Sequence, residues 1–371
     1  MNFGKKRKLH GKFGIRMLDK VSDLEHFYNK KRILVTGHTG FKGGWLTVFL
    51  KEFGSKVFGI SLDRKKISIQ SGFDHFFVND EILTDINNVN KYKKEVLKFN
   101  PEILFYFASQ PLVRSAYLNP LKTIKSNVMG LSKFLNFCRS LNSLKYILIV
   151  TSDKVYEYEK NEKSFKETDK LGGLEPYGSS KAMQEIISKC FYFSYFSGNK
   201  KIITARAGNV LGGGDWAKDR LITDIITAIK HKNFMKVRYP HNTRPWQYVC
   251  DLIYGYLLTV YMVSRDVHKF YAFNFSPKKS YPVNDILRFS KKYWGDMFNY
   301  KIVNNQKIYE QHKLSISNKK ITEYINWNTK NKLSEILLPT FDWYEAFLNK
   351  ENMKKKNKVI VKKFLNIDYR E

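Results

Sequence analysis

A short apolar run followed by closely spaced glycines constrains the fold of this chain more than any other feature. Residues 33–35 lead into glycines at positions 37, 40 and 43, and an amphipathic stretch from Trp45 follows. This order predicts a strand, a tight turn and a helix. Glycines let the turn approach a diphosphate, and a helix N-terminus favours an anion. The stretch therefore predicts a dinucleotide site formed by Gly37, Thr39, Gly40, Phe41 and Gly43.

A second apolar run, at 57–62, supports this interpretation. It ends in Asp63, twenty residues after Gly43. A carboxylate at this point accepts from both ribose hydroxyls and favours NAD over NADP, although the following Arg64 offers a partner to a 2′-phosphate. The spacing G-x-x-G-x-x-G differs from that of simple dehydrogenases. It resembles the fingerprint of the extended short-chain dehydrogenase/reductase superfamily.

Alternating apolar strands and helical patterns run from residue 32 to about 210. Strands are predicted at 32–36, 57–62, 103–108, 145–151 and 201–206, with helices at 42–53, 91–99, 121–141 and 177–198. This alternation predicts an α/β fold with a Rossmann-like, doubly wound parallel sheet. We divide the chain into a basic N-terminal tail and lead-in (1–31), an NAD-binding domain (32–210), a mainly substrate-binding, mixed α/β lobe (211–349) and a Lys-rich, loosely docked or mobile C-terminal tail (350–371).

Ligands of such sheets bind beyond the carboxyl ends of the strands, so the residues after each strand are candidates. Asp85 and Ile86 follow a weakly strand-like stretch at 76–79, where the superfamily places an acidic residue beside adenine. Ala108 and Gln110 follow the strand at 103–108, on the expected nicotinamide side. Asn127, in the next helix, is a candidate prop for the active-site backbone. We assign all five to cofactor binding.

Groups suited to the oxidation of an alcohol follow the strand at 145–151. Ser152 lies at its end, and Tyr177 and Lys181 are four residues apart, on one face of the predicted helix. An ammonium beside a phenol lowers the pKa of the phenol from about 10. Such a pair also fits an exposed helical surface. Because this pair follows the glycine turn and Ser152 in the chain, we favour a catalytic role for it. We interpret Ser152 as a hydrogen-bond partner of the reacting hydroxyl, Tyr177 as its base and NAD as the hydride acceptor.

Asp153 and Lys154 refine this assignment. A simple epimerase needs no further acid and base beside the serine, whereas a dehydratase must remove a proton and expel a hydroxide. Over residues 26–350 the chain resembles the CDP-glucose 4,6-dehydratases. The resemblance is carried by TGHTGFKGGW (36–45), SQPLVRSAY (109–117), NVMG (127–130), TSDKVY (151–156), YGSSK (177–181), ARAGNVLGGGDWAKDRLI (205–222) and PHNTRPWQYV (240–249).

The sequence departs from its relatives at two points. The dTDP-glucose dehydratases carry Asp-Glu where this chain has Asp153-Lys154, which fits the CDP-sugar branch instead. Val155 stands where the family pattern has Cys, and the N-terminal tail is an addition.

The resemblance implies a reaction in three steps. Tyr177 takes the proton of the C4 hydroxyl while NAD accepts the C4 hydride. Lys154 then removes the C5 proton while Asp153 protonates the departing C6 hydroxyl, which requires a lowered pKa for Lys154 and a partly protonated Asp153. Return of the hydride to C6 gives CDP-4-dehydro-6-deoxyglucose, a precursor for deoxysugars of surface polysaccharides such as the O-antigen of lipopolysaccharide.

Arginines and a tryptophan are the candidates for binding the nucleotide sugar. The guanidinium forks of Arg220 and Arg244 match the oxygens of a diphosphate. We add Asn209 and Gln110 as sugar contacts. Trp216 is a candidate for bordering the cytosine and fits a core position equally well.

The net charge and the cysteines limit the remaining alternatives for the function of the chain. The net charge of +31 permits nucleic-acid binding, but it is spread along the chain and no nucleic-acid-binding motif accompanies it, so we expect no nucleic-acid partner. Cys138, Cys190 and Cys250 fit buried free thiols of a cytoplasmic protein, without a metal. No apolar run is long enough to span a membrane. A homodimer is expected from the superfamily. A 4-epimerase, a GDP-, UDP- or dTDP-sugar dehydratase, and a non-catalytic NAD- or nucleic-acid-binding protein remain alternatives.

Overall fold

The computed structural model describes residues 20–64, 66–73, 75–158, 164–267, 270–303, 315–329 and 332–367. Most of the predicted N-terminal tail therefore lies outside the described residues. The lead-in forms helix α1 (Lys20–Tyr28), whose Leu24 and Tyr28 are buried.

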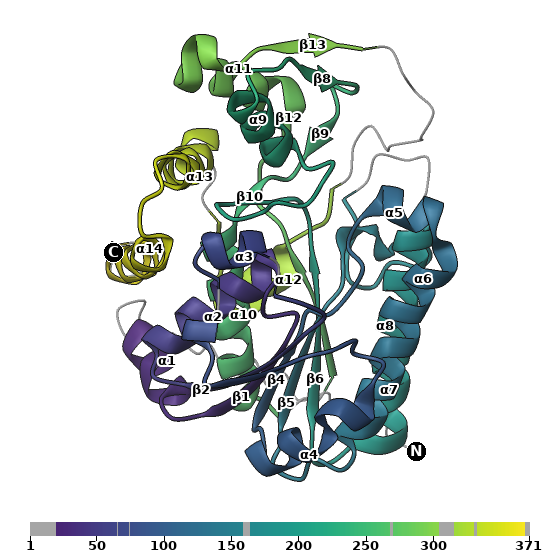
Figure 1. The fold of residues 1–371 in the computed structure, drawn as a ribbon. Helices are drawn as coiled ribbons and strands as arrows, with labels where there is room; N and C mark the ends of the chain where they lie inside the picture. Colours follow the sequence, from purple (N-terminus) through teal and green to yellow (C-terminus); the bar gives the residue numbers. More distant parts are fainter. Residues whose placement is uncertain are drawn as a thin grey trace.

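A parallel sheet of seven strands lies at the centre of the molecule, in the order β11-β6-β5-β4-β1-β2-β3 (Figure 1). Its strands are β1 (Arg32–Thr36), β2 (Lys56–Ser61), β3 (Asp80–Leu83), β4 (Ile103–Tyr106), β5 (Tyr146–Val150), β6 (Lys201–Ala207) and β11 (Phe270–Phe275). The sheet confirms the predicted Rossmann-like α/β class. The weak prediction at 76–79 was wrong: a 3-10 turn (His75–Phe77) stands there, and β3 begins at Asp80.

Helices cover both faces of the sheet because successive strand residues point to opposite sides. Ile33 and Val35 pack in the core under α2 (Phe41–Glu52) and α10 (Val249–Ser264). Leu34 packs in the opposite core, under α4 (Val89–Phe99) and α7 (Gly130–Cys138), with the end of α8 (Pro176–Phe191) nearby. Strands buried on both faces explain the continuous apolar runs in the sequence.

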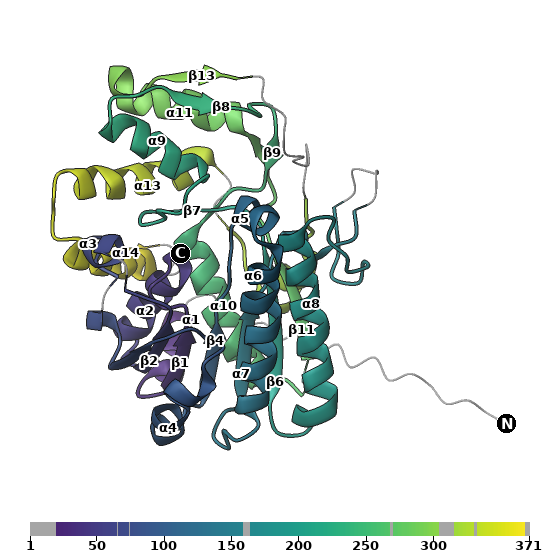
Figure 2. The ribbon, with the colours of Figure 1, turned by 45° about the vertical axis from the view of Figure 1, so that its right-hand side comes forward.

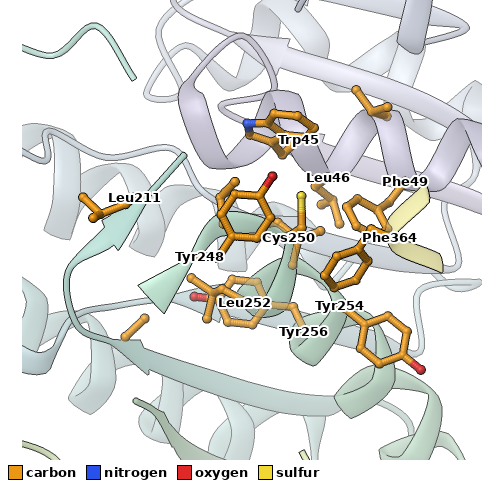
Figure 3. Packing of buried hydrophobic residues seen from close by; sticks show 14 of the residues in the cluster. Trp45, Leu46, Phe49, Leu211, Tyr248, Cys250, Leu252, Tyr254, Tyr256 and Phe364 are labelled. Atoms are coloured by element: carbon orange, nitrogen blue, oxygen red, sulfur yellow. The ribbon is translucent and has the colours of Figure 1, made fainter. Parts of the chain in front are cut away.

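The chain returns to the sheet after the predicted domain boundary at 210. Strand β11 pairs in parallel with β6, from Phe270 opposite Ile202 to Phe275 opposite Ala207. Helix α10 packs beneath the same sheet and joins α2 in an apolar cluster that includes Trp45, Phe49 and Tyr254 (Figure 3). The sheet therefore includes a strand from beyond residue 210, where we placed the boundary between the NAD-binding domain and the substrate-binding lobe.

A smaller set of elements lies above the carboxyl ends of the strands (Figure 2). It contains α9 (Leu221–Lys230), α11 (Val283–Trp294) and α13 (Leu333–Leu348), with three short strand pairs. The pairs are β7 (Val210–Leu211) with β10 (Gln247–Tyr248), β9 (Thr243–Arg244) with β12 (Tyr281–Pro282), and β8 (Met235–Val237) with β13 (Tyr300–Ile302).

The Lys-rich segment after residue 350 is a docked helix, and our prediction of a loosely docked or mobile tail was wrong. Helix α14 (Met353–Ile367) buries Val361 and Phe364, and the Phe364 ring lies 5.7 Å from that of Phe49 on α2. The buried Asn357 donates to the Ser71 carbonyl at 2.9 Å. The lysines of α14 are exposed or half-buried beside these residues, and Lys356 pairs with Asp342 of α13, so a Lys-rich composition alone did not reveal the docking.

Two further expectations were checked on the described residues. Cys138 and Cys250 are buried free thiols, but Cys190 is exposed near the end of α8, so the prediction of three buried thiols was wrong for Cys190. In the part of the chain that the structure describes, no helix combines the length and the apolar character needed to cross a bilayer.

Candidate active site

The glycine turn between β1 and α2 is tightly closed. Gly37 has φ of +73°, a conformation that side chains disfavour. A Cβ atom on Gly43 would lie 2.2 Å from the Gly37 carbonyl oxygen, so only glycine fits at position 43. Gly40 is the N-cap of α2 and Phe41 its first residue, which brings the helix N-terminus to the turn. This cradle fits a dinucleotide diphosphate.

Asp63, which the sequence suggested as a partner of the ribose, lies shortly after β2. Asp63 is exposed, and its backbone carbonyl accepts from the Thr39 hydroxyl at 2.9 Å. Arg64 is held in an ion pair by Glu81 of β3. The same glutamate lies 2.9 Å from the His38 ring, so Arg64 is tied to a neighbouring strand.

The residues after β3 and β4 form a hydrogen-bonded layer. Asp85 accepts from the backbone and side chain of Asn87 at 2.8 and 2.9 Å, while Ile86 is buried. Asn127 accepts from the Gln110 backbone at 2.7 Å and donates to Ser180 of α8 at 2.9 Å, so it props this loop as expected. The Ala108 backbone donates to Thr36 at 3.1 Å.

The Gln110 side chain is occupied within its own loop. Its amide donates to the Leu112 carbonyl at 3.1 Å and to the Thr123 hydroxyl at 3.0 Å. It therefore braces the loop, and the structure supplies no free donor for the sugar contact that the sequence suggested.

A short 3-10 turn, Asp153–Val155, follows β5 closely and has Ser152 as its N-cap. The Ser152 hydroxyl donates to the Asp153 carboxylate at 2.8 Å and accepts from the Lys154 backbone at 3.2 Å. Burial raises the pKa of Asp153 above its ordinary value, while Lys154, the Ser152 hydrogen bond, Arg244 and Lys42 oppose the rise. A raised pKa is what an acid requires to hold its proton.

Tyr177 lies in the first turn of α8, which Glu175 caps by accepting from the backbones of Tyr177 and Gly178. Burial raises the pKa of the Tyr177 phenol to about 12. A hydrogen bond with Ser152 and the charge of Arg220 oppose the rise. The predicted lowering of this pKa was therefore wrong for the structure described here, because burial outweighs the opposing charges.

Lys181, one turn further along α8, is also buried. Its ammonium donates to the Val150 carbonyl at 3.1 Å and to Gln184 at 3.0 Å. Burial and then Lys42 lower its pKa to about 7, against the attraction of Glu185. Its charge is thus anchored to the end of β5, beneath the serine turn.

A pocket brings four of the five candidate catalytic residues together with three of the candidate substrate contacts. Ser152, Asp153, Lys154, Tyr177, Asn209 and Arg220 line one part of it, beside Phe41 and Lys42 of the glycine turn. Lys154, Asn209 and Arg220 also line a larger adjoining part, where Arg244 is joined by further cations. These are Arg114, Lys218, Lys236 and Arg238. Three acids share this part, Asp215, Asp219 and Asp224, and Asp219 pairs with Arg114 and Arg238; the cations still outnumber them, which suits an anionic ligand.

Trp216 lies elsewhere. Its indole donates to the Ser71 hydroxyl at 2.7 Å, and its ring packs on Tyr344 and Phe347 of α13. The core alternative that the sequence left open is thus the observed one, and Trp216 supports the loop that carries Asp215.

In the smaller part of the pocket, sequence reasoning missed two charged residues, Lys42 and Asp215. Lys42 stands inside the glycine motif and Asp215 inside the glycine-rich run at 211–216, where both were treated as parts of a motif. A charged residue inside a turn that is predicted to bind a ligand is a signal that could have identified each of them. Among the described residues there is no group of three His, Cys, Asp or Glu side chains arranged to hold a metal ion.

Comparisons with known proteins agree with this geometry. A family model described as GDP-mannose 4,6 dehydratase matches residues 34–339. A CDP-glucose 4,6-dehydratase of Salmonella typhimurium is 34% identical over 349 residues, which cover 91% of this chain and 95% of that protein.

Solved structures share the fold at lower identity. An epimerase from Methanothermobacter thermautotrophicus superposes with a TM-score of 0.78 at 20% identity, covering 91% of this chain and 98% of that one. The UDP-glucuronic acid 4-epimerase from Bacillus cereus, in complex with UDP-glucuronic acid and NAD, gives 0.72 at 20% identity, covering 85% and 99%.

The seven-stranded sheet, the glycine turn and the strand-end pocket define a fold of the extended short-chain dehydrogenase/reductase type. Within that class, the family model and the Salmonella relative are decisive. The chain belongs to the GDP-mannose 4,6 dehydratase family.

Proposed function

We propose that this protein is an NAD-dependent sugar-nucleotide 4,6-dehydratase, a hydro-lyase, and that its substrate is CDP-glucose. The observation that carries the reaction type is the pair Asp153 and Lys154 beside Ser152 and Tyr177 in one pocket. An elimination needs both an acid and a base next to the oxidising groups, whereas an epimerase does not. The 34% identity to a CDP-glucose 4,6-dehydratase supports the choice of nucleotide.

The residues at the strand ends fit NAD. The glycine cradle at 37–43 would receive the diphosphate, and Asp63 would receive the adenosine ribose. The Glu81 carboxylate already pairs with the Arg64 guanidinium and balances its charge. Arg64 is therefore less available to a 2′-phosphate, which favours NAD over NADP. Bound NAD supplies one function here: it accepts a hydride from the sugar and later returns it.

Ser152 and Tyr177 would act on the C4 hydroxyl. Ser152 orients the hydroxyl and Tyr177 accepts its proton. A Tyr177 pKa of about 12 must fall for this step, and Arg220 is the cation that acts on it in that direction. The product of this step is a ketone at C4, which acidifies the proton on C5.

Asp153 and Lys154 would then carry out the elimination. Burial raises the pKa of Asp153, which favours the protonated carboxyl that the departing C6 hydroxyl needs. Lys154, the next residue, takes the C5 proton. The C5–H electron pair forms the C5–C6 double bond as water leaves.

Arg220, Arg244 and Asn209 would hold the rest of the substrate. All three line the larger part of the pocket, where the surrounding cations suit a diphosphate. The product would be CDP-4-dehydro-6-deoxyglucose, a precursor for deoxysugars.

The direct test is incubation of the purified protein with NAD and CDP-, dTDP-, GDP- or UDP-glucose. We expect a 4-keto-6-deoxy sugar from CDP-glucose, detected by mass spectrometry as the loss of water. A 4-epimer of unchanged mass would show the alternative epimerase activity. Turnover of only another nucleotide sugar would reject CDP-glucose as the substrate.

Replacing Lys154 with Met tests the base. The variant should bind NAD normally but exchange the C5 proton with deuterated water at least about 100-fold more slowly, because general-base catalysis contributes that much. Lys170→Met, a change of another lysine outside the pocket lining, is the matched control. Undiminished C5 exchange in Lys154→Met would remove Lys154 from the mechanism.

We further propose a homodimer formed through α5 (Val113–Leu118), α6 (Pro120–Ile124) and α8. These helices pack on one another along one flank of the sheet (Figure 2). Their outer surface exposes Leu118 and Leu121, each 80% exposed, and Ile186, 57% exposed. Apolar side chains gathered on neighbouring helices mark a surface for a partner.

A further inference from the structure

Lys42 is a cation in the reaction pocket to which the proposed chemistry gives no role. It is the second residue of α2, fixed between Phe41 and Gly43 of the glycine turn. Its side chain lines the same part of the pocket as Ser152, Asp153 and Tyr177. Asp153 and Asp215 are the acids that act on it, and Arg220 is the nearby cation that repels it.

The surroundings of Lys42 keep it charged at neutral pH. Burial and then the charge of Arg220 lower its pKa to about 8, against the opposing effect of Asp153 and Asp215. Asp215 is held in place because its backbone carbonyl accepts from Thr223 at 2.6 Å and from Tyr344 at 2.8 Å. A pKa near 8 leaves most of the Lys42 side chains protonated at pH 7.

We propose that Lys42 is a positioning residue that strengthens Asp153 as the acid of the elimination, by stabilising the carboxylate that Asp153 becomes. This inference rests on the proposed function. In the step concerned, the C5–H bond breaks and its proton goes to Lys154. The C6–O bond also breaks, and the Asp153 proton leaves with that oxygen as water. Asp153 ends as an anion, and a cation facing it lowers the energy of that state.

Among the other groups that act on Asp153, only Arg244 also keeps a positive charge through the step. Ser152 is neutral, Tyr177 gives and takes a proton, and Lys154 changes charge in the step itself. Arg244 lies in the larger part of the pocket, where we assign it to the diphosphate. Lys42 faces Asp153 from the glycine turn and is itself faced by Asp215, Arg220 and Lys181.

The test compares Lys42→Met and Lys42→Arg with Lys51→Met, a change on the same helix outside the pocket lining. Loss of the cation should raise the pKa of Asp153, so the alkaline limb of kcat should move up by about one pH unit. On the plateau below both alkaline limbs, where Asp153 is protonated in both proteins, turnover should fall by up to about 10-fold, because a weaker acid gives up its proton less readily and each pKa unit corresponds to that factor. Lys42→Arg should restore both properties, and Lys51→Met should match the unaltered protein.

A second readout needs no turnover. The infrared carbonyl band of a protonated buried carboxyl, assigned to Asp153 by its loss in Asp153→Asn, is followed against pH in the folded protein. In Lys42→Met the band should persist to a pH about one unit higher. This measurement tests the coupling of Lys42 to Asp153 even if the protein acts on no CDP-sugar.

Two results would overturn the inference. An unchanged alkaline limb and an unchanged carbonyl band in a folded Lys42→Met protein would show that Lys42 does not act on Asp153. Weaker NAD binding by calorimetry, with both pH profiles unchanged, would assign Lys42 to the cofactor instead. Lys42→Gln, a polar replacement of shorter reach, serves if Lys42→Met fails to fold.

Discussion

At the scale of single residues, the buried ring of His38 is held by hydrogen bonds in its neutral form. The Glu81 carboxylate can only accept, so a neutral His38 ring donates to it from Nε2 at 2.9 Å and leaves Nδ1, 3.1 Å from the Ser61 hydroxyl, as an acceptor. The ring fills the space beside Gly59, where a Cβ atom would lie 2.5 Å away. Burial lowers the pKa of His38 to about 4 even though Glu81 lies close, because Arg64 neutralises that carboxylate.

The free energy of unfolding should therefore depend on His38 in acid. Its pKa is about 6.5 in the unfolded chain and about 4 in the folded one, so between these values the unfolded chain binds more protons. Stability present above pH 6.5 should be lost as the pH falls towards 4, by up to about 3 kcal/mol. Urea unfolding of His38→Gln between pH 7 and 4.5 should show a smaller loss than the unaltered protein. His26→Gln, an exposed control, should not. Parallel losses in the two variants would contradict this.

At the scale of elements, the sequence predicted what local patterns encode. Five of the seven strands were located within two residues because continuous apolar runs mark strands buried on both faces. Strand β11 was missed because its place beside β6 depends on contacts about 70 residues apart in the chain. The sequence also placed Ser152 and Tyr177 in one site, because Ser152 follows a strand and Tyr177 lies at the start of a helix. The position of Trp216 and the inward turn of the Gln110 side chain depend on packing, which no local pattern reports.

Helix α14 is the element whose role changed most. Its Phe364 is buried against Phe49 of α2 and Tyr254 of α10 (Figure 3). Phe364→Ala should lower the free energy of unfolding by about 3 kcal/mol or more, because it removes a buried ring and leaves a cavity. Lys363→Ala, an exposed neighbour, should cost little. Chemical denaturation measures both, and equal stability of the two variants would contradict the docking of α14.

At the scale of the whole molecule, the flank formed by α5, α6 and α8 sets the expected assembly. Charged side chains at the centre of an apolar interface leave unpaired charges buried and prevent association. Leu121→Glu combined with Ile186→Glu should therefore convert the homodimer to single chains in analytical ultracentrifugation. Val267→Glu, at a position 83% exposed outside these helices, is the control that should leave the dimer intact. An unaltered protein that sediments as a single chain would reject the proposed dimer.

The bond between Asn357 and Ser71 joins residues 286 positions apart. During synthesis, the chain around Ser71 leaves the ribosome long before Asn357 exists. The apolar surface of α2 and the turn at Ser71 therefore stay uncovered until α14 has left the ribosome. Such surfaces expose a nascent chain to aggregation and to chaperones. A protein cut short before residue 353 would keep every residue of the pocket and would still lack the last cover of its core.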